Sequence, residues 1–583
     1  MGAAGCTQKE SGTTTFWGYL QKWRDIWREM CFTEAMKWPP KIPDIPDEER
    51  TPLVTALLEI VQIQQELIQE LKDEIARLKG QKPKPRIKPS ALEKDSGNKE
   101  SSAKRSGSSK RDKTESLEIH ETVIVKARNV PTGSKFKGYE DFTVQGLLLQ
   151  PLNTLYRRER WKTPEGRYIL ASLPEEIKGL GSHFDTSLQS FILYQYYHCH
   201  VTQPLILEQL LELGIDISAG QVNRIIVEGN DLFHEEKDEV LRVGLKVSGH
   251  VHVDDTGARH QGRNGYCTHI GNDLFAWFQS TNSKSRINFL ELLRAGKHDY
   301  VLNSEALAYM KAQRLPKAPL EGLAALRGGV FEDEARWMTC LDSLDCTNKR
   351  HIRIATEGAL LGSVLEHGDI HPDLVIVSDD AGQFDVLLHA LCWIHAERSI
   401  HKLVAFNDAQ RDALEEIRTR IWEFYGELKT YKQTPGKDKK AELEKCFDGI
   451  FTSRTCYATL NQALKRIHKN KSELLLVLER PDIPLHNNAS ETDIREYAKK
   501  RKISGSTRSD PGRRCRDTFA SLKKTCRKLG VRFWAYLNDR LSGKRSILPL
   551  ADLMRRRVCE SLGNPPLATH APLVRKLPLQ LCA

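Results

Sequence analysis

Three acidic residues stand where their side chains could hold divalent metal ions. Asp254 ends a β-like run, Asp379 ends a second β-like run, and Glu491 opens a helix-like segment. Three carboxylates brought together from such elements can bind two Mg²⁺ ions, because Mg²⁺ prefers oxygen ligands. Paired ions activate an attacking oxygen and stabilise the leaving oxygen when a phosphodiester bond is cleaved or transferred. The chemistry to expect from this trio is metal-dependent nucleotidyl transfer.

Each of these acids also has an ordinary structural explanation. Asp is common where a strand ends in a turn, and Glu in the first turn of a helix complements the helix dipole. Together, two Asp residues at strand ends followed by a Glu at a helix start favour a metal site over three separate structural roles. Asp255, Asp380 and Asp493 lie close by and leave the choice of ligands open. Asp255 follows Asp254 on the opposite face of a strand, so only one of that pair can reach a shared ion.

The segments around the first two acids predict a mixed core of strands and helices. We expect a three-stranded meander, a helix from about Ser285 and a later buried strand. The expected strands are 246–254, 266–270, 274–279 and 374–377. This order is that of the ribonuclease H-like arrangement, in which the first and fourth strands lie side by side. Such a sheet would bring Asp254 and Asp379 close enough to share a metal ion.

A long helical segment separates the second acid from the third. Residues 403–479 carry helical patterns without a sustained heptad repeat. We expect them to form most of an α-helical insertion spanning 391–485. The core then resumes at 486–541 with the helix of Glu491 and a basic tail.

The first 116 residues contain three segments of different character. Residues 1–50 hold four tryptophans on a helix-like stretch suited to packing. Within 51–80, a heptad pattern over 54–78 predicts a parallel two-stranded coiled coil, with an amphipathic helix docked on its own protein as the alternative. Residues 81–116 are rich in Lys, Ser, Gly and Pro, which is typical of a flexible basic linker.

Residues 117–240 are expected to be mixed and then helical. Short β-like runs stand at 121–127 and 141–149, and helical patterns begin at 183.

Within this helical part, residues 204–229 predict two helices joined at Gly214, the second capped by Ser218. This is a helix-turn-helix outline, although two packed helices joined by a glycine turn are the commoner explanation. If the two helices form a DNA-binding helix-turn-helix, the second helix would present three polar side chains to a DNA groove, those of Gln221, Asn223 and Arg224.

Charge is distributed unevenly along the 583 residues. The net charge is +11, and between Ala498 and Arg557 there are 19 Lys or Arg against four Asp. Such a concentration is the electrostatic footprint of a polyanion partner, and a solvated basic face is the simpler alternative. No apolar run approaches transmembrane length, the first residues lack the order of a signal peptide, and the 13 cysteines form no CxxC pair. We therefore expect a soluble intracellular protein of several domains.

Three blocks of sequence carry a resemblance to a known family. They are HVDDTGARH, then VSDDAGQF followed by CWIHAERSIHKL, then HNNASETDIREYAKKRKISGS followed by SLKKTCRKLGVRFWAYLNDRL. These blocks resemble transposases of the insertion-sequence 66 family, bacterial enzymes of the DDE class. The likeness runs from about 246 to 541 and more loosely toward the N-terminus. It implies that Asp254, Asp379 and Glu491 are the catalytic acids and hold Mg²⁺, with Mn²⁺ as a substitute.

The chain departs from the family pattern in three places. It lacks the paired cysteines that often lie between the coiled coil and the helical domain, so an N-terminal zinc finger is not expected. The interval between the first two acids is longer, with a helical and loop-rich insertion around 298–371. Asp255 stands where the family usually has Glu, which leaves the neighbouring Asp254 unchanged.

Basic residues near Glu491 are candidates to contact DNA. Arg495 lies one helical turn after Glu491 and could contact a phosphate or orient that carboxylate. Further along, a set of cations would follow the sugar-phosphate backbone: Lys499, Lys500, Arg501, Lys502 and Arg508. Asn487 and Asn488 are candidates to cap the helix or to contact DNA, and capping is the favoured role.

Cys392 and His395 form a Cys-x-x-His pair shortly after Asp379. The pair resembles an element that several DDE transposases carry downstream of the second aspartate. Two ligands do not complete a zinc site, and packing of both side chains near the core is an equal alternative. In either case His395 and Arg398 lie one turn apart and could support the wall of the site.

We therefore expect an α/β protein with a ribonuclease H-like catalytic core, an α-helical insertion, an N-terminal coiled coil and a helical DNA-binding region. The expected segments are 1–50, 51–80, 81–116, 117–240, 241–390, 391–485, 486–541 and a C-terminal extension, 542–583.

The expected function is that of a bacterial DNA transposase that cleaves and transfers strands of an insertion sequence with Mg²⁺. Expected partners are the element ends, the target DNA, further copies through the coiled coil and small accessory proteins, with no membrane. The expected location is the cytoplasm, in association with the nucleoid. The alternatives are a DNA-binding accessory protein whose core is inactive or depends on a partner, and a junction resolvase, which the long helical insertion disfavours.

Overall fold

The computed structural model describes residues 118–174 and 183–561. The chain divides into two compact units, Met1–Val144 and Gln145–Ala583. The predicted tryptophan-rich segment, coiled coil and basic linker all lie outside the described residues, as do residues 562–583. All the elements below belong to the second unit.

The strands expected at 121–127 and 141–149 are absent from the structure. Their apolar side chains are instead exposed, as Val125 and Phe142 illustrate. A strand requires a hydrogen-bonded neighbour, and alternation of apolar residues does not supply one. The short hairpin of this region lies further along, between β1 (Arg160–Lys162) and β2 (Tyr168–Leu170).

The region from 183 is helical, as the sequence predicted. It contains, in order, α4 (Thr186–Leu193), the π-helical turn η2 (Tyr194–His198), α5 (Gln203–Glu212), α6 (Ala219–Val227) and α7 (Asp231–Val247). The turn between α5 and α6 has the predicted chemistry. Gly214 adopts φ +79°, which favours glycine, and the Ser218 hydroxyl accepts a hydrogen bond from the backbone N–H of Gln221 at the start of α6.

A five-stranded mixed sheet forms the centre of the second unit, which confirms the α/β class. Its order is β5-β4-β3-β8-β9. The strands are β3 (His250–Gly257), β4 (Tyr266–Gly271), β5 (Ala276–Thr281), β8 (Val375–Ser378) and β9 (Leu388–Leu391). The first three are antiparallel, whereas β3, β8 and β9 run parallel. The first and fourth strands, β3 and β8, are neighbours, as expected.

The first strand is shifted relative to its prediction. Helix α7 continues through Val247, and β3 begins at His250 and extends beyond Asp254 to Gly257. The prediction failed because Val240, Val243 and Val247 also fit the spacing of a buried helical face. Asp254 therefore lies within a strand and not at its end.

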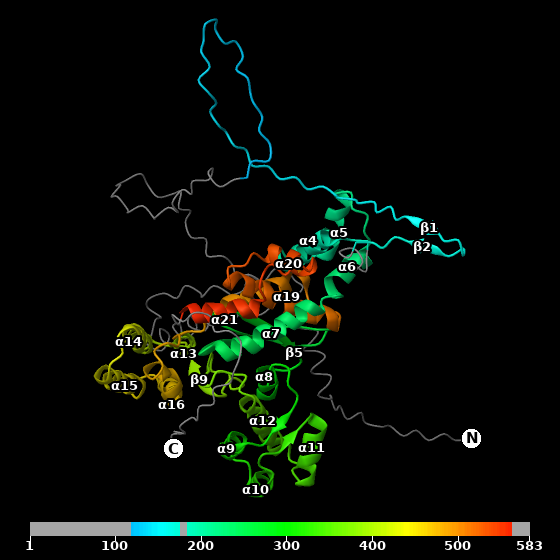
Figure 1. Ribbon diagram of the computed structural model, residues 1–583. Helices are drawn as coiled ribbons and strands as arrows, with labels where there is room; N and C mark the ends of the chain where they lie inside the picture. The colour runs from blue at the N-terminus through cyan, green and yellow to red at the C-terminus, as the bar shows by residue number, and fades with distance from the viewer. Residues whose placement is uncertain (1–117, 175–182, 562–583) are drawn as a thin grey trace, which may run out of the picture. The chain divides into compact units, whose positions relative to one another are not determined.

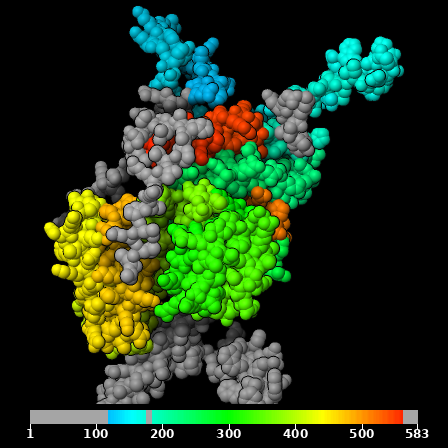
Figure 2. All heavy atoms as spheres, turned by 60° about the horizontal axis from the view of Figure 1, so that its bottom comes forward, coloured from blue at the N-terminus to red at the C-terminus, as the bar shows by residue number. Residues whose placement is uncertain are grey.

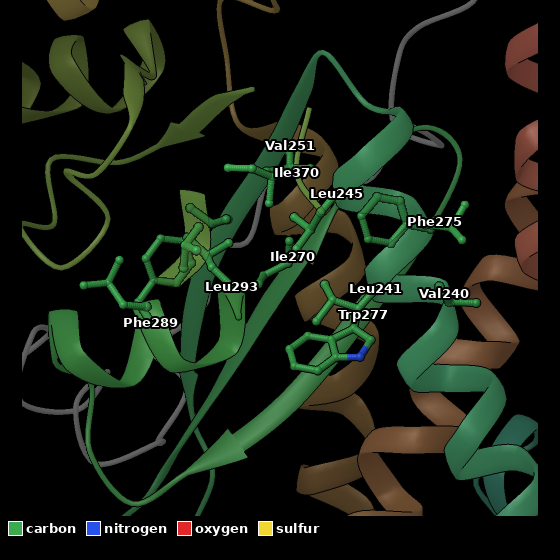
Figure 3. Close-up of a cluster of buried hydrophobic side chains, with 14 of the residues drawn as sticks. Val240, Leu241, Leu245, Val251, Ile270, Phe275, Trp277, Phe289, Leu293 and Ile370 are labelled. Carbon is green, nitrogen blue, oxygen red and sulfur yellow. The ribbon is translucent and has the colours of Figure 1, made fainter. Parts of the chain in front are cut away.

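Two helices cover one face of the sheet. Figure 3 shows side chains of α7 and α8 (Arg286–Leu293) meeting those of β3, β4 and β5, with Leu241, Phe289, Val251 and Trp277 among them. Most of the members of this cluster are fully buried. The cluster fixes the position of β3, the strand that carries Asp254.

Two later helices complete the sheet from its other side and its edge. Helix α18 (Asn488–Ser504) packs on β3 and β4, where Ile494 and Tyr497 meet Phe278. Helix α19 (Asp510–Lys528) lies along the edge strand β5 and against α7, next to which Figure 1 shows it. Three of its side chains accept hydrogen bonds from backbone N–H groups of β5: Asp517 from Ser280, Ser521 from Phe278 and Thr525 from Ala276. These bonds satisfy an edge that would otherwise be open to pairing.

The chain between β5 and β8 forms a largely helical segment. After α8 it contains β6 (Tyr300–Val301), α9 (Ser304–Ala312), α10 (Lys317–Ala325), β7 (Val330–Phe331), α11 (Glu334–Ser343) and α12 (Lys349–Glu366). The two short strands pair with each other, and α12 packs on α8 and α9. This segment is the longer interval that separates Asp254 from Asp379.

The chain between β9 and α18 is the predicted α-helical insertion. It contains α13 (Trp393–His401), α14 (Asp408–Gln433), α15 (Lys437–Phe451), α16 (Ala458–Lys469), α17 (Lys471–Leu474) and the 3-10 turn η3 (Leu476–Leu478). A hydrophobic cluster that these helices share with strands β8 and β9 holds them together, centred on Trp393, Phe424 and Phe447. In Figure 2 the atoms of α14 to α16, yellow to orange, form a lobe distinct from the green atoms of residues 286–366.

Helices α20 (Phe533–Leu541) and α21 (Leu550–Ser561) follow α19 and pack against α4 and α7 respectively. Among the helices of residues 118–174 and 183–561, none is long and apolar enough to cross a lipid bilayer.

Candidate active site

Two of the three predicted acids meet at the junction of β3 and β8. These strands pair in parallel, with His252 opposite Val377. Continued by two residues, the same register sets Asp254 opposite Asp379, which directly follows β8. Neighbouring strands lie about 4.8 Å apart, so the two carboxylates start from adjacent backbone positions. The strand adjacency predicted from the sequence thus places this pair together.

Glu491 reaches the same place from α18. It lies in the first turn of the helix, and its carboxylate, together with those of Asp379 and Asp255, acts electrostatically on Asp254. Glu491 is largely buried, and its Oε1 atom accepts no hydrogen bond from any described residue. A buried carboxylate oxygen that accepts no hydrogen bond is suited to bind a cation.

The start of α18 is fixed to β3 by Asn487. This side chain is fully buried and forms hydrogen bonds to His252 Nδ1 (2.9 Å) and to the carbonyl oxygen of Val253 (2.8 Å). Its backbone N–H donates to Cys392 Sγ at 3.2 Å. Asn487 occupies the N-cap position but makes no capping bond with its side chain, so the predicted capping role is wrong. The side chain bonds across to the strand because both partners are buried there and need a polar neighbour.

A second connection runs from β4 to α18 through His269, a residue that the sequence analysis missed. His269 is paired with Asp254 across the two strands, and its ring contacts Ser490 Oγ (2.7 Å) and Asp493 Oδ2 (3.3 Å). Lys524 and Lys528 also pair with Asp493. Burial alone would raise the pKa of Asp493, but His269 and Lys528 lower it. The carboxylate of Asp493 is therefore engaged in ion pairs that hold the fold together. The signal was present, because an alternating strand pattern puts His269 on the face of Asp254 once the register is known.

Asp254 and Asp255 have different surroundings. Burial and the neighbouring carboxylates Asp379, Asp255 and Glu491 raise the pKa of Asp254 to about 7, against a hydrogen bond from the Asp255 N–H that lowers it. Asp255 accepts hydrogen bonds from Thr268 Oγ1 (2.5 Å) and Gln383 Nε2 (3.0 Å), and burial raises its pKa. Asp254 thus shares its face of the sheet with Glu491, while both oxygens of Asp255 already have donors.

The trio is more widely spaced than a preformed site for one ion. Within the described part of the chain, the group of three residues whose ligand atoms lie within 4.8 Å of one another is a different one, namely Asp385, His389 and Glu473. If Asp254, Asp379 and Glu491 hold metal, their wider spacing would suit a pair of ions better than a single ion. The donor set is all oxygen, as Mg²⁺ prefers.

His395 and Arg398 border Glu491. The Nε2 atom of His395 lies 3.6 Å from Glu491 Oε1, and the Nη2 atom of Arg398 lies 3.9 Å from it. Burial and Arg398 lower the pKa of His395, so the imidazole is neutral at neutral pH. Cys392 is buried, and its sulfur accepts the backbone N–H of Asn487. Cys392 thus packs beneath the site, which is the structural alternative of the sequence analysis.

The predicted DNA contacts divide into exposed and attached residues. Lys499, Lys502 and Arg508 are exposed, and Arg495 is exposed while its guanidinium pairs with Glu491 Oε2 at 2.9 Å. Arg501 bonds to Thr256 Oγ1 (3.2 Å) and to the Gly257 carbonyl.

Lys500 does not fit the predicted phosphate contact. It is buried, donates to the carbonyl of Tyr196 at 2.7 Å and lies 3.5 Å from the centre of that ring. Burial, Arg516 and Lys523 lower its pKa to about 7. The helical period would have predicted this, since Lys500 lies one turn after the buried Tyr497.

Part of the positive charge of residues 498–557 is likewise internal. Glu496 pairs with Lys523 (2.5 Å), Lys524 (2.7 Å) and Arg527 (3.2 Å), and the first two cations are buried. Charge counted along the sequence therefore overstates the charge that α18 and α19 offer to a partner.

Comparisons with known proteins identify the family of the chain. The sequence model of the family described as "Transposase IS66 family" matches residues 375–514, which include Asp379 and Glu491. The chain is also 44% identical over 318 residues to "Uncharacterized protein y4jO" of Sinorhizobium fredii (strain NBRC 101917 / NGR234). That match covers 54% of this chain and 99% of the relative. By these similarities, the chain belongs to the IS66 family of transposases.

Proposed function

We propose that this transposase is a DDE enzyme with a ribonuclease H-like core, and that Asp254, Asp379 and Glu491 are its catalytic acids. The observation that carries the proposal is the register of β3 and β8, which sets Asp254 opposite Asp379, with Glu491 close enough to raise the pKa of Asp254. The sheet order, with three antiparallel strands followed by two parallel ones, supports the same core.

The three carboxylates would hold Mg²⁺, for which Mn²⁺ can substitute. When bound, the ions supply Lewis acidity to the attacking and leaving oxygens of a phosphodiester. Asp254 gives up its proton when it becomes a ligand, because metal ligands must be deprotonated. Arg398 pairs with Glu491 from one side while its guanidinium also donates to Nε2 of His395, and Arg495 pairs with Glu491 from the other side. The attacking group is first water and then the freed 3′ hydroxyl, so no covalent protein intermediate is needed.

Contacts to DNA fall to residues around the acids and to α6. Lys499, Lys502 and Arg508 are placed to bind phosphates, which contributes affinity that falls with salt. On α6, Asn223 and Arg224 are exposed, and Asn223 Oδ1 accepts a hydrogen bond from Gln203. We infer that this helix contacts bases at the element ends, with Gln221 half-buried at its start.

The assembly that performs the reaction is also part of the proposal. Residues 54–78 would join two copies through a coiled coil, and small accessory proteins would complete the complex. The setting is the cytoplasm, on nucleoid DNA. A polyanion partner agrees with the exposed cations of α18.

One experiment tests the proposed activity. Purified protein is incubated with Mg²⁺ and labelled ends of the element that flanks its gene, and the same assay is run with Asp254→Asn. The wild type should cleave and join the ends, and the variant should bind them without cleaving. Equal cleavage by both proteins would contradict the assignment of the site. If the wild type only binds the ends, the protein is a DNA-binding component whose core needs a partner.

A further inference from the structure

A second cluster of side chains that could bind a metal ion lies near the end of β8 and does not include the acids Asp254, Asp379 and Glu491. It consists of Asp385 in the loop before β9, His389 on β9 and Glu473 on the short helix α17. His389 is buried, Glu473 is partly buried and Asp385 is exposed. The cluster joins the sheet to the helical insertion, because α17 packs directly on β9.

The hydrogen bonds around His389 define which ring nitrogen carries the proton. Ser378 Oγ lies 2.6 Å from the carbonyl oxygen of Asp379 and must donate to it, because a carbonyl can only accept. The same hydroxyl lies 2.7 Å from His389 Nε2. Its single proton is already used, so Nε2–H must donate to Ser378 Oγ. In the neutral ring this leaves Nδ1 as an acceptor with a free lone pair.

That lone pair faces another acceptor. His389 Nδ1 lies 2.8 Å from Glu473 Oε1, and a carboxylate oxygen has no proton to give. Two lone pairs at this distance require a cation between them. A second proton on the ring would supply one, as in an ion pair. A metal ion would supply it equally well, and a carboxylate oxygen of Asp385 within 4.8 Å of both ligand atoms favours the ion.

We propose that Asp385, His389 and Glu473 bind a Zn²⁺ ion, separate from the Mg²⁺ of the acid trio. One imidazole and two carboxylates form a ligand set that suits zinc, with water in the fourth position. Imidazole nitrogen is a poor ligand for Mg²⁺, which prefers oxygen. The hydrogen bond from Nε2–H to Ser378 is the outer contact that orients a metal-bound histidine.

The geometry is close to that of a bound site. Ligand atoms on one zinc ion lie at most about 4.2 Å apart, twice the usual bond length. The three atoms here lie within 4.8 Å of one another. Asp385 can close the difference because its side chain is 60% exposed, and its nearest cation, Arg286, is 3.6 Å away. Arg286 is held elsewhere, by Tyr309 and the carbonyl of Gly382.

A zinc ion here would fasten the helical insertion to β9, the strand that pairs with β8, after which Asp379 follows directly. Glu473 belongs to the insertion, His389 to the sheet, and Ser378 connects the site to the backbone of Asp379. The inference does not depend on the proposed function, since it concerns residues outside the acid trio.

Zinc binding tests the inference on the full chain. The protein is stripped with a chelator and titrated with Zn²⁺ against a chromophoric competitor, in excess Mg²⁺ to occupy the acid trio. Visible absorption of bound Co²⁺ reports the nitrogen-containing site independently. The variants are Asp385→Asn, Glu473→Gln and His389→Gln. Asp380→Asn is the matched control, since Asp380 is an exposed acid nearby that bonds to Asn470 and lies outside the cluster. Asp254→Asn controls for binding at the acid trio.

We expect one tightly bound ion in the wild type, in Asp380→Asn and in Asp254→Asn. Each cluster variant should bind at least about 100-fold more weakly, because loss of a direct ligand exceeds the effect of losing an outer contact. Asp385→Asn changes an exposed side chain and should fold normally, which circular dichroism verifies. The proposal is overturned if the wild type holds no zinc against Mg²⁺, or if Asp385→Asn and Glu473→Gln bind it as the wild type does. In that event, His389 and Glu473 form an ion pair.

Discussion

Asp254 and Asp255 are neighbours in sequence with different neighbours in space. Strand alternation turns Asp254 toward α18 and Glu491, and turns Asp255 toward Thr268 and Gln383. Burial and the negative charges of three nearby carboxylates raise the pKa of Asp254 to about 7. A carboxyl held at this pKa is primed to exchange its proton for a metal ion.

This pKa predicts a pH-dependent metal affinity. Below pH 7, an ion must displace the proton of Asp254, so the apparent affinity for Mg²⁺ or Mn²⁺ should rise about tenfold per pH unit and level off above the pKa. Calorimetric titration of Mn²⁺ at about pH 6 and about pH 8 measures the change. Asp255→Asn should keep a rise of this steepness but level off at a somewhat lower pH, because the Asp255 carboxylate contributes to the raised pKa of Asp254. A flat affinity across this range would show that Asp254 is not a ligand.

The same pKa has a consequence for stability. The carboxyl of Asp254 titrates near 3.9 in an unfolded chain and near 7 in the folded metal-free protein. The folded state therefore binds an extra proton between these values, and the contribution of this group to stability falls as pH rises through them. Asp254→Asn removes this loss, so the metal-free variant should unfold at a higher temperature than the wild type at about pH 8. At about pH 4 the difference should shrink, which differential scanning calorimetry can measure.

At the scale of elements, the site depends on how α18 is held against β3. Asn487 forms the closest connection, through His252 and the carbonyl of Val253. Asn487→Ala leaves both partners buried without this hydrogen bond, at a cost of about 1–3 kcal/mol each. Denaturant unfolding should therefore show a loss of about 2–6 kcal/mol. Metal-dependent cleavage should fall as well, because Glu491 is carried by the same helix.

The neighbouring Asn488 provides the control for this variant. It is exposed in the first turn of α18, so Asn488→Ala should change stability by less than about 0.5 kcal/mol. Equal effects at Asn487 and Asn488 would contradict the anchoring role.

The contact between α18 and α19 is electrostatic and should be sensitive to acid. Burial alone would raise the pKa of Glu496, but Lys523 and Lys524 lower it to about 2. The stability that it contributes is complete above the ordinary carboxyl pKa of about 4.3 and is lost as pH falls through about 2. Glu496→Gln leaves buried cations without this partner and should cost about 3–5 kcal/mol at neutral pH.

Urea unfolding of wild type and Glu496→Gln tests this account. The difference between them should shrink as the pH is lowered toward about 2, where the wild-type carboxylate is also protonated. Glu415→Gln removes an exposed pair with Arg418 and should have an effect of at most about 1 kcal/mol. A constant difference at all pH values would mean that packing, and not charge, accounts for the loss.

The elements that the sequence predicted well have strong local signals. Strands β4, β5 and β8 lie between clear turn residues, and α18 follows a compact polar block that marks the position of Glu491. The end of α7 was misplaced because the spacing of the valines fits both the period of a helix and the alternation of a strand. The bonds that Asn487 makes to β3 could not be read from the chain, because they depend on which distant element packs there. The burial of Lys500 follows from the helical period, and the place of His269 follows from the strand register once that register is known.

At the scale of the whole molecule, the basic charge is divided between internal pairs and surface. Lys523 and Lys524 neutralise Glu496 in the interior, whereas Lys499 and Lys502 remain exposed on α18. Only the exposed set can displace counterions from DNA.

This division predicts different effects for adjacent lysines. Lys502→Ala should weaken DNA binding and reduce the slope of log affinity against log salt by about 0.9, as for one lost phosphate contact. Lys500→Ala should leave that slope unchanged and lower the unfolding temperature, because its ammonium group bonds to Tyr196 in the interior. Fluorescence anisotropy over a series of salt concentrations measures both slopes. The opposite pattern would place Lys500 on the DNA.

The chain brings its site together from widely separated segments. Helical segments lie between Asp254 and Asp379 and again between Asp379 and Glu491, and the sheet, with α18 on it, unites all three acids. The insertions can therefore shape contacts with DNA without changing the spacing of the acids, which the strand register and α18 determine.

Joining of a pre-cut element end to target DNA tests the central claim most directly, because it isolates strand transfer. Wild type is compared in Mg²⁺ with Asp254→Asn, Asp379→Asn, Glu491→Gln and the adjacent Asp255→Asn. The account predicts that each of the first three falls to the level seen without metal while still binding the DNA, and that Asp255→Asn retains joining. Joining that survives in Asp254→Asn but is lost in Asp255→Asn would contradict it.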